Sequence, residues 1–426
     1  MKNIILTANG TQKADLVLKN ASIVNVFTES IEVGDVAITD GKIVGIGRYE
    51  GKIEKDMTGR FVCPGFIDGH IHLESSMVTP SEFARAVIAH GTTAVITDPH
   101  EIANVAGCDG ITYMMQATKD LPLDVFFMVP SCVPATDLDE SGACLNADDI
   151  TPFYNDRRVL GLAEMMNAFG VNQADGSVLS KIKTTLEHDR IIDGHAPLLT
   201  GKELNAYTAA GIRSDHECSN IAEAKEKLSR GQWIMIREGT AAKNLQELMP
   251  LFEAPYYNRI LLVTDDKHPL DLLNDGHIDA IIRKAVHLGA NPIRAIKAGS
   301  LNAATYFGLR DTGAIAPGYD ADIVVLNDLT DLHVQEVYKQ GTLISERGQI
   351  TTAVNSNTDS IPERVIHSFH VEKITPAQLV IPKQGEHIRV IELHAGELLT
   401  SERTASWNTD TSAKDWADGI NPDDDI

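Results

Sequence analysis

The sequence lacks three features, and each absence excludes a class of protein. Its five cysteines include no Cys-x-x-Cys pair, so we predict no disulfide framework and a reducing compartment, the cytoplasm. Asp and Glu number 60 against 37 Lys and Arg, and the net charge of -23 offers no basic surplus for nucleic acid. No apolar run approaches about 18 residues, and the N-terminal one is short and broken by Thr, Asn and Gly. We therefore expect neither a membrane span nor a signal peptide, and a small molecule as the partner.

The two ends of the chain show the pattern of short β-strands. With 426 residues, of which 43% are hydrophobic, the chain is long enough for two or three domains. Apolar and polar residues alternate between residues 14 and 61 and again after residue 310, and Thr39-Asp40-Gly41-Lys42 is a typical hairpin turn. We predict that residues 1–61 and 310–358 form two parts of one small β-sandwich domain.

Residues 62–309 follow a different rhythm, in which apolar runs alternate with helical stretches. The sequence Thr79-Pro80-Ser81-Glu82 predicts a helix start with a capping box, and Asn291-Pro292 predicts another. Continuous apolar runs of this kind are typical of parallel strands buried on both faces. Eight of them are present, at residues 62–69, 93–98, 125–129, 159–163, 190–194, 212–214, 233–236 and 259–263. The predicted fold class is α/β, a (β/α)8 TIM barrel inserted into the small β-sandwich.

Polar side chains of the metal-binding types follow nearly every predicted strand. In a barrel the carboxyl ends of all strands meet at one face, which is where active sites lie. Coincidence accounts poorly for so regular a placement. The strand ends read His70-Ile71-His72, Asp98-Pro99-His100-Glu101, Glu164, His195, Asp215-His216-Glu217, Arg237-Glu238 and Thr264-Asp265-Asp266.

These strand ends suit a site for two divalent cations. Alternate residues of a strand point the same way, so His70 and His72 face one side together and suit the first cation. His195 and His216 would hold a second cation, and the carboxylate of Glu164 would bridge the two. Asp265 would contact the first cation and a water between the cations, and would act as general base and then general acid. Asp266 remains an alternative to Asp265, because periodicity does not fix the register to one residue.

Other strand-end residues allow more than one interpretation. His100 and Glu101 are candidates for contact with substrate, for weak metal binding, or for a structural pair. Glu217 and Glu238 are equally balanced between functional and structural roles. No role is assigned to the histidines at positions 188, 268, 277 and 287.

Several motifs resemble a known enzyme family. His70-Ile71-His72 behind Pro-Gly-Phe-Ile-Asp-Gly resembles the amidohydrolase superfamily. Over residues 14–395 the resemblance is to the adenine deaminase family in particular. The motifs that carry it are Gly-His-Ile-His-Leu-Glu-Ser-Ser-Met-Val-Thr-Pro, Gly-Thr-Thr-Ala-Val-Ile-Thr-Asp-Pro-His-Glu-Ile-Ala-Asn-Val-Ala-Gly, Leu-Ala-Glu-Met-Met-Asn, Asp-Gly-His-Ala-Pro, Ser-Asp-His-Glu and Val-Thr-Asp-Asp.

The resemblance implies hydrolysis of adenine to hypoxanthine and ammonia, with two divalent metal ions, manganese or iron. Carried over, the metal ligands are His70, His72, Glu164, His195, His216 and Asp265. Asp265, Glu164 and His216 are the implied catalytic residues, and Glu101, Glu217 and His100 are candidates for holding the purine. The carboxylate of Glu164 separates the chain from cyclic-amide hydrolases such as dihydroorotase, which use a carboxylated lysine there and are the nearest chemical alternative.

The C-terminal part departs from that family, whose members carry a further domain. The similarity fades after Leu399. We expect residues 359–399 to be only the start of such a domain and residues 400–426 to be an acidic, disordered tail. Exposed strand edges there would favour association, so a homo-oligomer, a dimer, is expected. A weakly active or inactive relative that binds metal or a partner is the second functional hypothesis.

Overall fold

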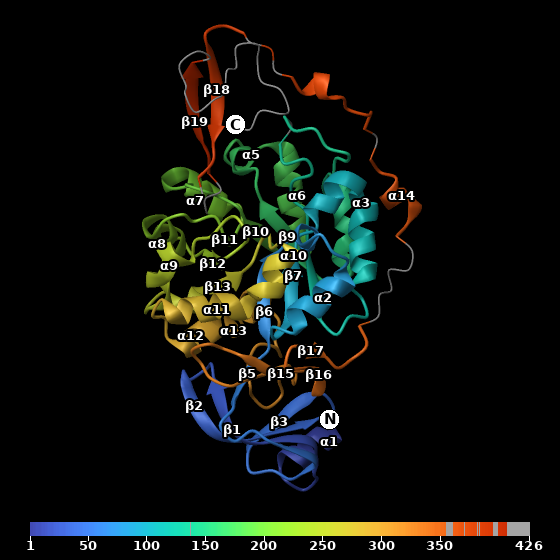
Figure 1. Cartoon of the computed structure of the whole chain (residues 1–426), viewed down its shortest axis with the longest axis vertical. Helices are drawn as coiled ribbons and strands as arrows, with labels where there is room; N and C mark the ends of the chain where they lie inside the picture. Colours follow the sequence, from blue (N-terminus) through green and yellow to red (C-terminus); the bar gives the residue numbers. More distant parts are fainter. Residues whose placement is uncertain are drawn as a thin grey trace. The chain divides into compact units, whose positions relative to one another are not determined.

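The computed structural model describes residues 1–136, 138–354, 361–369, 371–380, 382, 384–394 and 399–406. The chain divides into two compact units, Met1–Ile366 and His367–Ile426. Within the first unit, a mixed β-sheet lies at one end and a set of parallel strands with their helices lies at the other (Figure 1). No helix among the described residues is both long and apolar enough to cross a membrane.

Strands from both ends of the first unit share one nine-stranded sheet, in the order β17-β16-β15-β14-β5-β1-β2-β3, with β4 paired to β1. Antiparallel pairing of Cys63 in β5 with Val324 in β14 joins the two segments. The association predicted from the alternating pattern is therefore present, but as one continuous sheet; two packed layers remain a prediction. The strands are β1 (Ala14–Asn25), β2 (Ser30–Thr39), β3 (Lys42–Gly47), β4 (Gly51–Asp56), β5 (Phe61–Pro64), β14 (Ile323–Leu326), β15 (Val334–Lys339), β16 (Thr342–Glu346) and β17 (Gln349–Ile350).

The predicted first barrel strand, residues 62–69, is two strands in the structure. Its first part is β5 of the mixed sheet, and only Phe66–Ile71 forms the parallel strand β6. Gly65 lies between them, and a Cβ there would stand 2.2 Å from the hydroxyl of Thr93. The chain therefore passes from one sheet to the other at a point too crowded for a side chain.

Eight parallel strands follow one another in chain order, as the apolar runs predict. They form a five-stranded sheet, β10-β9-β8-β7-β6, and a three-stranded sheet, β11-β12-β13. Backbone hydrogen bonds connect the two sheets at both borders, from Asp265 N to His70 O at 2.9 Å and from Arg213 N to Ile192 O at 3.0 Å. The remaining strands are β7 (Thr92–Thr97), β8 (Asp124–Val129), β9 (Val159–Met165), β10 (Ile191–Gly194), β11 (Ser214–Asp215), β12 (Trp233–Arg237) and β13 (Ile260–Val263).

Helices connect the parallel strands and complete an α/β fold. The helices of the first unit are α1 (Lys2–Ala8), η1 (Leu73–Ser76), α2 (Pro80–Ile88), α3 (His100–Ala117), α4 (Ala147–Ile150), η2 (Thr151–Asn155), α5 (Ala168–Asn172), α6 (Gly176–Glu187), α7 (Gly201–Ala209), α8 (Ile221–Ser229), α9 (Leu245–Leu248), η3 (Met249–Phe252), η4 (Tyr257–Arg259), α10 (Pro269–Asn274), α11 (Ile278–His287), α12 (Pro292–Ala298), α13 (Leu301–Phe307) and α14 (Glu363–Ile366).

The two predicted helix starts have different outcomes. Asn291 caps α12, because its side chain accepts from the backbone N–H groups of Ile293 and Arg294. Pro80 begins α2 as predicted, but the capping box there does not form. The Thr79 hydroxyl pairs with the Ser81 hydroxyl at 3.1 Å instead, and Glu82 pairs with Arg85.

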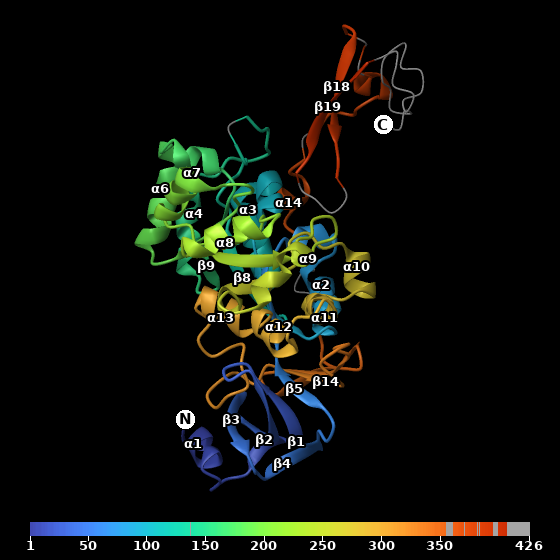
Figure 2. The same cartoon turned by 90° about the vertical axis from the view of Figure 1, so that its left-hand side faces the viewer.

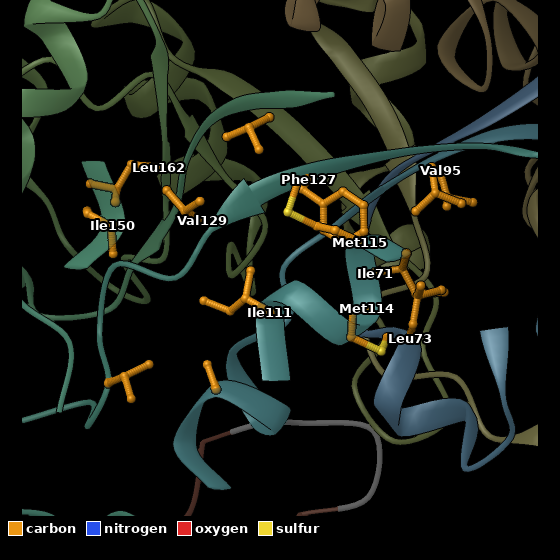
Figure 3. Close-up of a cluster of buried hydrophobic side chains, with 14 of the residues drawn as sticks. Ile71, Leu73, Val95, Ile111, Met114, Met115, Phe127, Val129, Ile150 and Leu162 are labelled. Atoms are coloured by element: carbon orange, nitrogen blue, oxygen red, sulfur yellow. The ribbon is translucent and has the colours of Figure 1, made fainter. Parts of the chain in front are cut away.

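The hydrophobic core supports the strand ends from outside the ring of strands. Ile71, between the two motif histidines, is fully buried in a cluster that includes Met114 of α3. Figure 3 shows Ile71 and Leu73 close to Met114. A second cluster joins Val24 and Val324 of the mixed sheet to Ile296 of α12, which lies between that sheet and the parallel strands (Figure 2). Because strand residues alternate, packing of Ile71 on one side directs its two neighbours to the other.

The second unit contains a β-hairpin. β18 (His387–Glu392) pairs antiparallel with β19 (Ser401–Ser406), and a 3-10 turn, η5 (Pro376–Leu379), precedes them. The expected disordered tail therefore does not begin at residue 400, since its first residues pair as a strand. The rest of that tail, residues 407–426, lies outside the described residues.

Candidate metal centre

The motif histidines meet at the carboxyl end of β6. The Nε2 atoms of His70 and His72 lie 3.2 Å apart, and both side chains are almost fully buried. The Nδ1 atom of His72 lies 3.0 Å from the backbone oxygen of Asp98, which fixes the plane of that ring. Two ring nitrogens converge on one small space, an arrangement that suits a shared cation.

Asp265 reaches the same point from the end of β13. Its Oδ1 lies 3.2 Å from His72 Nε2 and 3.8 Å from His70 Nε2. Its backbone has φ of 57°, in the left-handed region that is unusual for aspartate, and its N–H donates to His70 O. Asp266 is exposed and accepts a hydrogen bond from the Ser75 hydroxyl, although it also lies near His72 and Glu101. Of the two candidates, Asp265 is the one placed between the motif histidines.

Glu164 lies between two groups of imidazoles. Its Oε1 is 3.5 Å from His72 Nε2, while its Oε2 is 2.7 Å from His195 Nδ1 and 3.1 Å from His216 Nε2. The side chain is buried at the end of β9. The His216 ring stacks on that of His70 with centroids 4.5 Å apart. One carboxylate therefore faces both sets of nitrogens with different oxygens.

His100 and Glu101 stand beside this cluster, at the start of α3. His100 Nδ1 lies 2.9 Å from Asp98 Oδ2 and 3.5 Å from Glu164 Oε1. Glu101 Oε1 lies 3.2 Å from His72 Nδ1 and 3.3 Å from His100 Nε2, whereas Oε2 is buried without a hydrogen-bond partner. An unsatisfied buried carboxylate oxygen is costly, and it marks a position where a ligand N–H would be stabilised.

Arg237 contacts the same cluster, although sequence analysis gave it no role. It is buried at the end of β12 and donates to both oxygens of Glu217 and to Oδ2 of Asp265, the last at 2.6 Å. Glu217 Oε1 in turn lies 3.1 Å from His216 Nε2. Strand alternation after Trp233-Ile-Met-Ile would have placed Arg237 on the side of the inward-facing residues.

Glu238, the next residue, points elsewhere. Its Oε2 pairs with Lys284 Nζ at 2.5 Å and its Oε1 accepts from Leu245 N at 3.3 Å. These contacts favour its structural interpretation. Of the histidines without an assigned role, His277 is fully buried, with Nε2 2.9 Å from Asp68 Oδ2.

Burial and the charges of neighbouring side chains shift the pKa values of the clustered residues. Burial, with His216 and His72 close by, lowers the pKa of His70 to about 3. Burial would raise the pKa of Glu164, but the neighbouring His195 and His216 hold it well below its ordinary value. Burial opposes the charge of His72 as well, yet Glu101 and Asp265 raise its pKa well above the usual range. The carboxylates thus stay ionised and favour positive charge between them.

The donor set fits divalent cations. His70, His72 and Asp265 form one group whose ligand atoms lie within 4.8 Å of one another, and His70, Glu164 and His216 form another. His195, His216 and Glu217 make a third, and His72, Asp98, His100 and Glu164 a fourth. Imidazole nitrogens mixed with carboxylate oxygens are the ligands of zinc, manganese and iron sites. The groups overlap at Glu164 and at the histidines, which is the arrangement that adjacent cations need.

Comparison with known proteins places the chain in a family. Residues 61–344 match the Amidohydrolase family. The structure resembles that of atrazine chlorohydrolase TrzN from Arthrobacter aurescens TC1 complexed with zinc, with a TM-score of 0.59 at 16% identity over 79% of this chain and 97% of that one. A β-aspartyl dipeptidase from Fervidobacterium islandicum AW-1 gives a TM-score of 0.57 at 16% identity over 79% and 98%. The chain belongs to the amidohydrolases.

Similarity in sequence shows which family within the amidohydrolases the chain belongs to. The adenine deaminase of Desulfatibacillum aliphaticivorans is 47% identical over 401 residues, which are 94% of this chain and 70% of that protein. The adenine deaminase of Geobacillus kaustophilus is 45% identical over 406 residues, again 94% of this chain and 70% of that protein. Within the amidohydrolases, the chain is a member of the adenine deaminase family.

Proposed function

We propose that the chain hydrolyses adenine to hypoxanthine and ammonia at a pair of divalent cations, manganese or iron, as in purine salvage. The observation that carries the proposal is the position of Glu164, whose two oxygens face His72 on one side and His195 with His216 on the other. The names of the relatives supply the substrate. The hydrogen-bonded borders of the two parallel sheets support a closed (β/α)8 barrel as the scaffold.

The ligand assignment follows the two groups of nitrogens. His70, His72 and Asp265 would hold one cation, His195 and His216 the other, and Glu164 would bridge them. Bound there, the cations would supply Lewis acidity and lower the pKa of a nearby water towards neutrality. His216 and Glu164 act by holding that geometry.

Asp265 moves the proton. Its Oδ2 is occupied by Arg237, so Oδ1, which faces His72 and would also contact the cation, is the atom that accepts a proton from the attacking water. The water oxygen bonds to C6 of adenine, and Oδ1 then delivers the proton to the departing amino nitrogen. The C6–N bond breaks, ammonia leaves, and the ring retains the oxygen as hypoxanthine.

The three candidates for holding the purine, Glu101, Glu217 and His100, are not equivalent. The unpaired Oε2 of Glu101 can accept from a ring N–H. Both oxygens of Glu217 already accept from Arg237, so Glu217 acts on the ring only indirectly. His100 is held by Asp98 and orients Glu101 through Nε2.

Substrate choice is tested by parallel assays on manganese-loaded protein with adenine and with dihydroorotate. We expect hypoxanthine and ammonia in equal amounts from adenine, and loss of that activity after chelation. Turnover of the cyclic amide without turnover of adenine would favour a cyclic-amide hydrolase instead. Metal binding with no turnover of either compound would favour an inactive metal-binding relative.

We also propose a homo-oligomer, a dimer, in the cytoplasm. The paired strands β18 and β19 support association, because exposed side chains such as Ile391 and Leu393 lie on or beside a two-stranded hairpin. A hairpin of only two strands is marginally stable alone. Sedimentation analysis of the purified chain tests this point.

A further inference from the structure

Two buried aspartates that are not proposed ligands contact the backbone beside the ligands. The first is Asp68, two residues before His70 and fully buried. Its Oδ1 accepts from the backbone N–H of His70 and from that of Thr264, both at 3.2 Å. Its Oδ2 accepts from the Thr264 hydroxyl at 2.5 Å and lies 2.9 Å from His277 Nε2. Asp68 thus connects the segment that carries His70 with the residue before Asp265.

The second is Asp215, directly before His216 and also fully buried. Its Oδ1 accepts from Ala196 N at 2.8 Å, and its Oδ2 accepts from Glu217 N at 3.2 Å. Lys227, itself fully buried, donates to Asp215 Oδ2 at 3.0 Å and to Ala196 O at 2.6 Å. Asp215 thus connects the residue after His195 with the residue after His216.

Each aspartate contacts the segments that carry the proposed ligands of one cation, and the two aspartates serve different cations. Each accepts amide hydrogens from two different strand ends, and each pair of strand ends carries the proposed ligands of one cation. Other buried aspartates of the parallel strands differ. Asp98 accepts from the His100 ring, and Asp193 accepts from the hydroxyls of Ser214 and Tyr306. Among the buried aspartates in the described residues, only Asp68 and Asp215 connect the backbones of two ligand-bearing segments.

We propose that Asp68 and Asp215 are positioning residues, each of which fixes the ligand geometry of one cation: Asp68 for the cation at His70, His72 and Asp265, and Asp215 with Lys227 for the cation at His195 and His216. The inference rests on the proposed function, from which the ligand sets come. A carboxylate suits this task because its two oxygens accept several N–H groups at once, and a neighbouring cationic or imidazole group offsets its buried charge. Groups behind the ligands commonly change metal affinity by about 10–100-fold when they are removed.

The test measures the affinities of the two cation sites separately. Manganese is titrated into the chelated full-length chain in a competing metal buffer, and bound metal is counted. We expect two ions per chain for the unaltered protein. Asp68→Ala and Asp215→Ala should each weaken one binding step by at least about tenfold and leave the other within about threefold. If an alanine variant does not fold, Thr264→Val replaces Asp68→Ala and Lys227→Met replaces Asp215→Ala, because each removes a donor to the aspartate without emptying the site.

Combination with ligand variants assigns each effect to a site. Asp68→Ala together with His70→Ala should still bind one ion tightly, whereas Asp68→Ala together with His195→Ala should bind none tightly. The reverse is expected for Asp215→Ala. The matched control is Asp322→Ala, since Asp322 is also buried, pairs with Lys339 and accepts a backbone N–H from Gln340, but in the mixed sheet. It should leave both manganese affinities unchanged.

The inference and the proposed function fail in different ways. An unaltered chain that binds fewer than two ions would contradict the proposed pair of cations. Two ions in the unaltered chain, with equal weakening of both steps in each aspartate variant or no weakening at all, would overturn the positioning roles alone.

Discussion

Arg237 holds Asp265 by a charge-assisted hydrogen bond of 2.6 Å between Nη1 and Oδ2. Two nitrogens of the same guanidinium donate to the two oxygens of Glu217, so Arg237 fixes two carboxylates at the carboxyl ends of the parallel strands. A buried cation at this point favours the ionised form of Asp265, and its hydrogen bond to Oδ2 leaves Oδ1 as the oxygen that we propose for proton transfer. The direction of the pKa shift agrees, because burial would raise the pKa of Asp265 but His72, His216 and His70 lower it well below its ordinary value.

Replacement of Arg237 is expected to impair catalysis more than it impairs folding. Arg237→Met should lower kcat for adenine by about 100-fold or more, since it leaves Asp265 without its orienting donor. Arg237→Lys keeps the charge but loses the fork, and it should recover only part of that loss. Steady-state kinetics on metal-loaded variants decide this. Equal activity of the methionine variant and the unaltered protein would remove Arg237 from the site.

Asp265 and Asp266 can be distinguished by matched substitutions. Asp265→Ala should abolish detectable turnover even in preparations that retain metal, because the proton-transferring oxygen is lost. Asp266→Ala should retain most activity, because its carboxylate is exposed and contacts Ser75. The measurement is ammonia release normalised to bound manganese. The reverse order of effects would shift the proposed base by one residue.

Glu164 is expected to be needed for a full complement of metal. Glu164→Ala removes the carboxylate that faces both groups of imidazoles, and the protein should lose at least one cation per chain. Elemental analysis after dialysis against a fixed free manganese concentration provides the count. The control is Glu238→Ala, a glutamate that is also buried, directly after β12, but pairs with Lys284. Similar metal content in both variants would count against the bridging position.

The order of strands and helices was predictable from the sequence, because a strand buried on both faces is a short run of apolar residues. Most of the parallel strands are short apolar runs such as Ile260–Val263, and most have a His, Asp, Glu or Arg at their carboxyl end or within two residues of it. The carboxyl ends of parallel strands meet at one face whatever side chains they carry. Residues as far apart in the sequence as His70 and Asp265 could therefore be grouped from the sequence. The division at Gly65 was less accessible, since residues 62–69 were predicted as a single strand and the pairing of β5 with β14 separates β5 from β6.

Contacts that depend on non-local partners left no such trace. Arg237 shows its role only because Glu217 and Asp265 approach it from two other strands. The strand Ser401–Ser406 is polar and lacks alternation, and its structure comes from pairing with His387–Glu392. In each case the deciding interaction lies outside the local pattern.

Lys339 is expected to stabilise the junction between the mixed sheet and the parallel strands. Its ammonium lies 2.5 Å from Asp322 in the mixed-sheet region and 2.6 Å from Asp124 of β8. Lys339→Met would leave the buried Asp322 without its cation, at a cost of about 3–5 kcal/mol in the free energy of unfolding. The urea midpoint should fall, while activity of the remaining folded protein stays near normal. Lys52→Met removes an exposed pair with Asp15 and should leave the urea midpoint close to that of the unaltered protein.

Glu101 is expected to govern the affinity for the purine. Its Oε2 is buried without a partner, so a ring N–H that binds there gains a charge-assisted hydrogen bond of about 1.5–3 kcal/mol. Glu101→Gln should therefore raise KM for adenine by about tenfold or more, with a smaller effect on kcat. Glu217→Gln should instead lower kcat, since Glu217 acts through Arg237 and thus on Asp265. Initial-rate measurements over a range of adenine concentrations separate the two patterns. If both variants changed KM alone, the Arg237 link between Glu217 and proton transfer would be wrong.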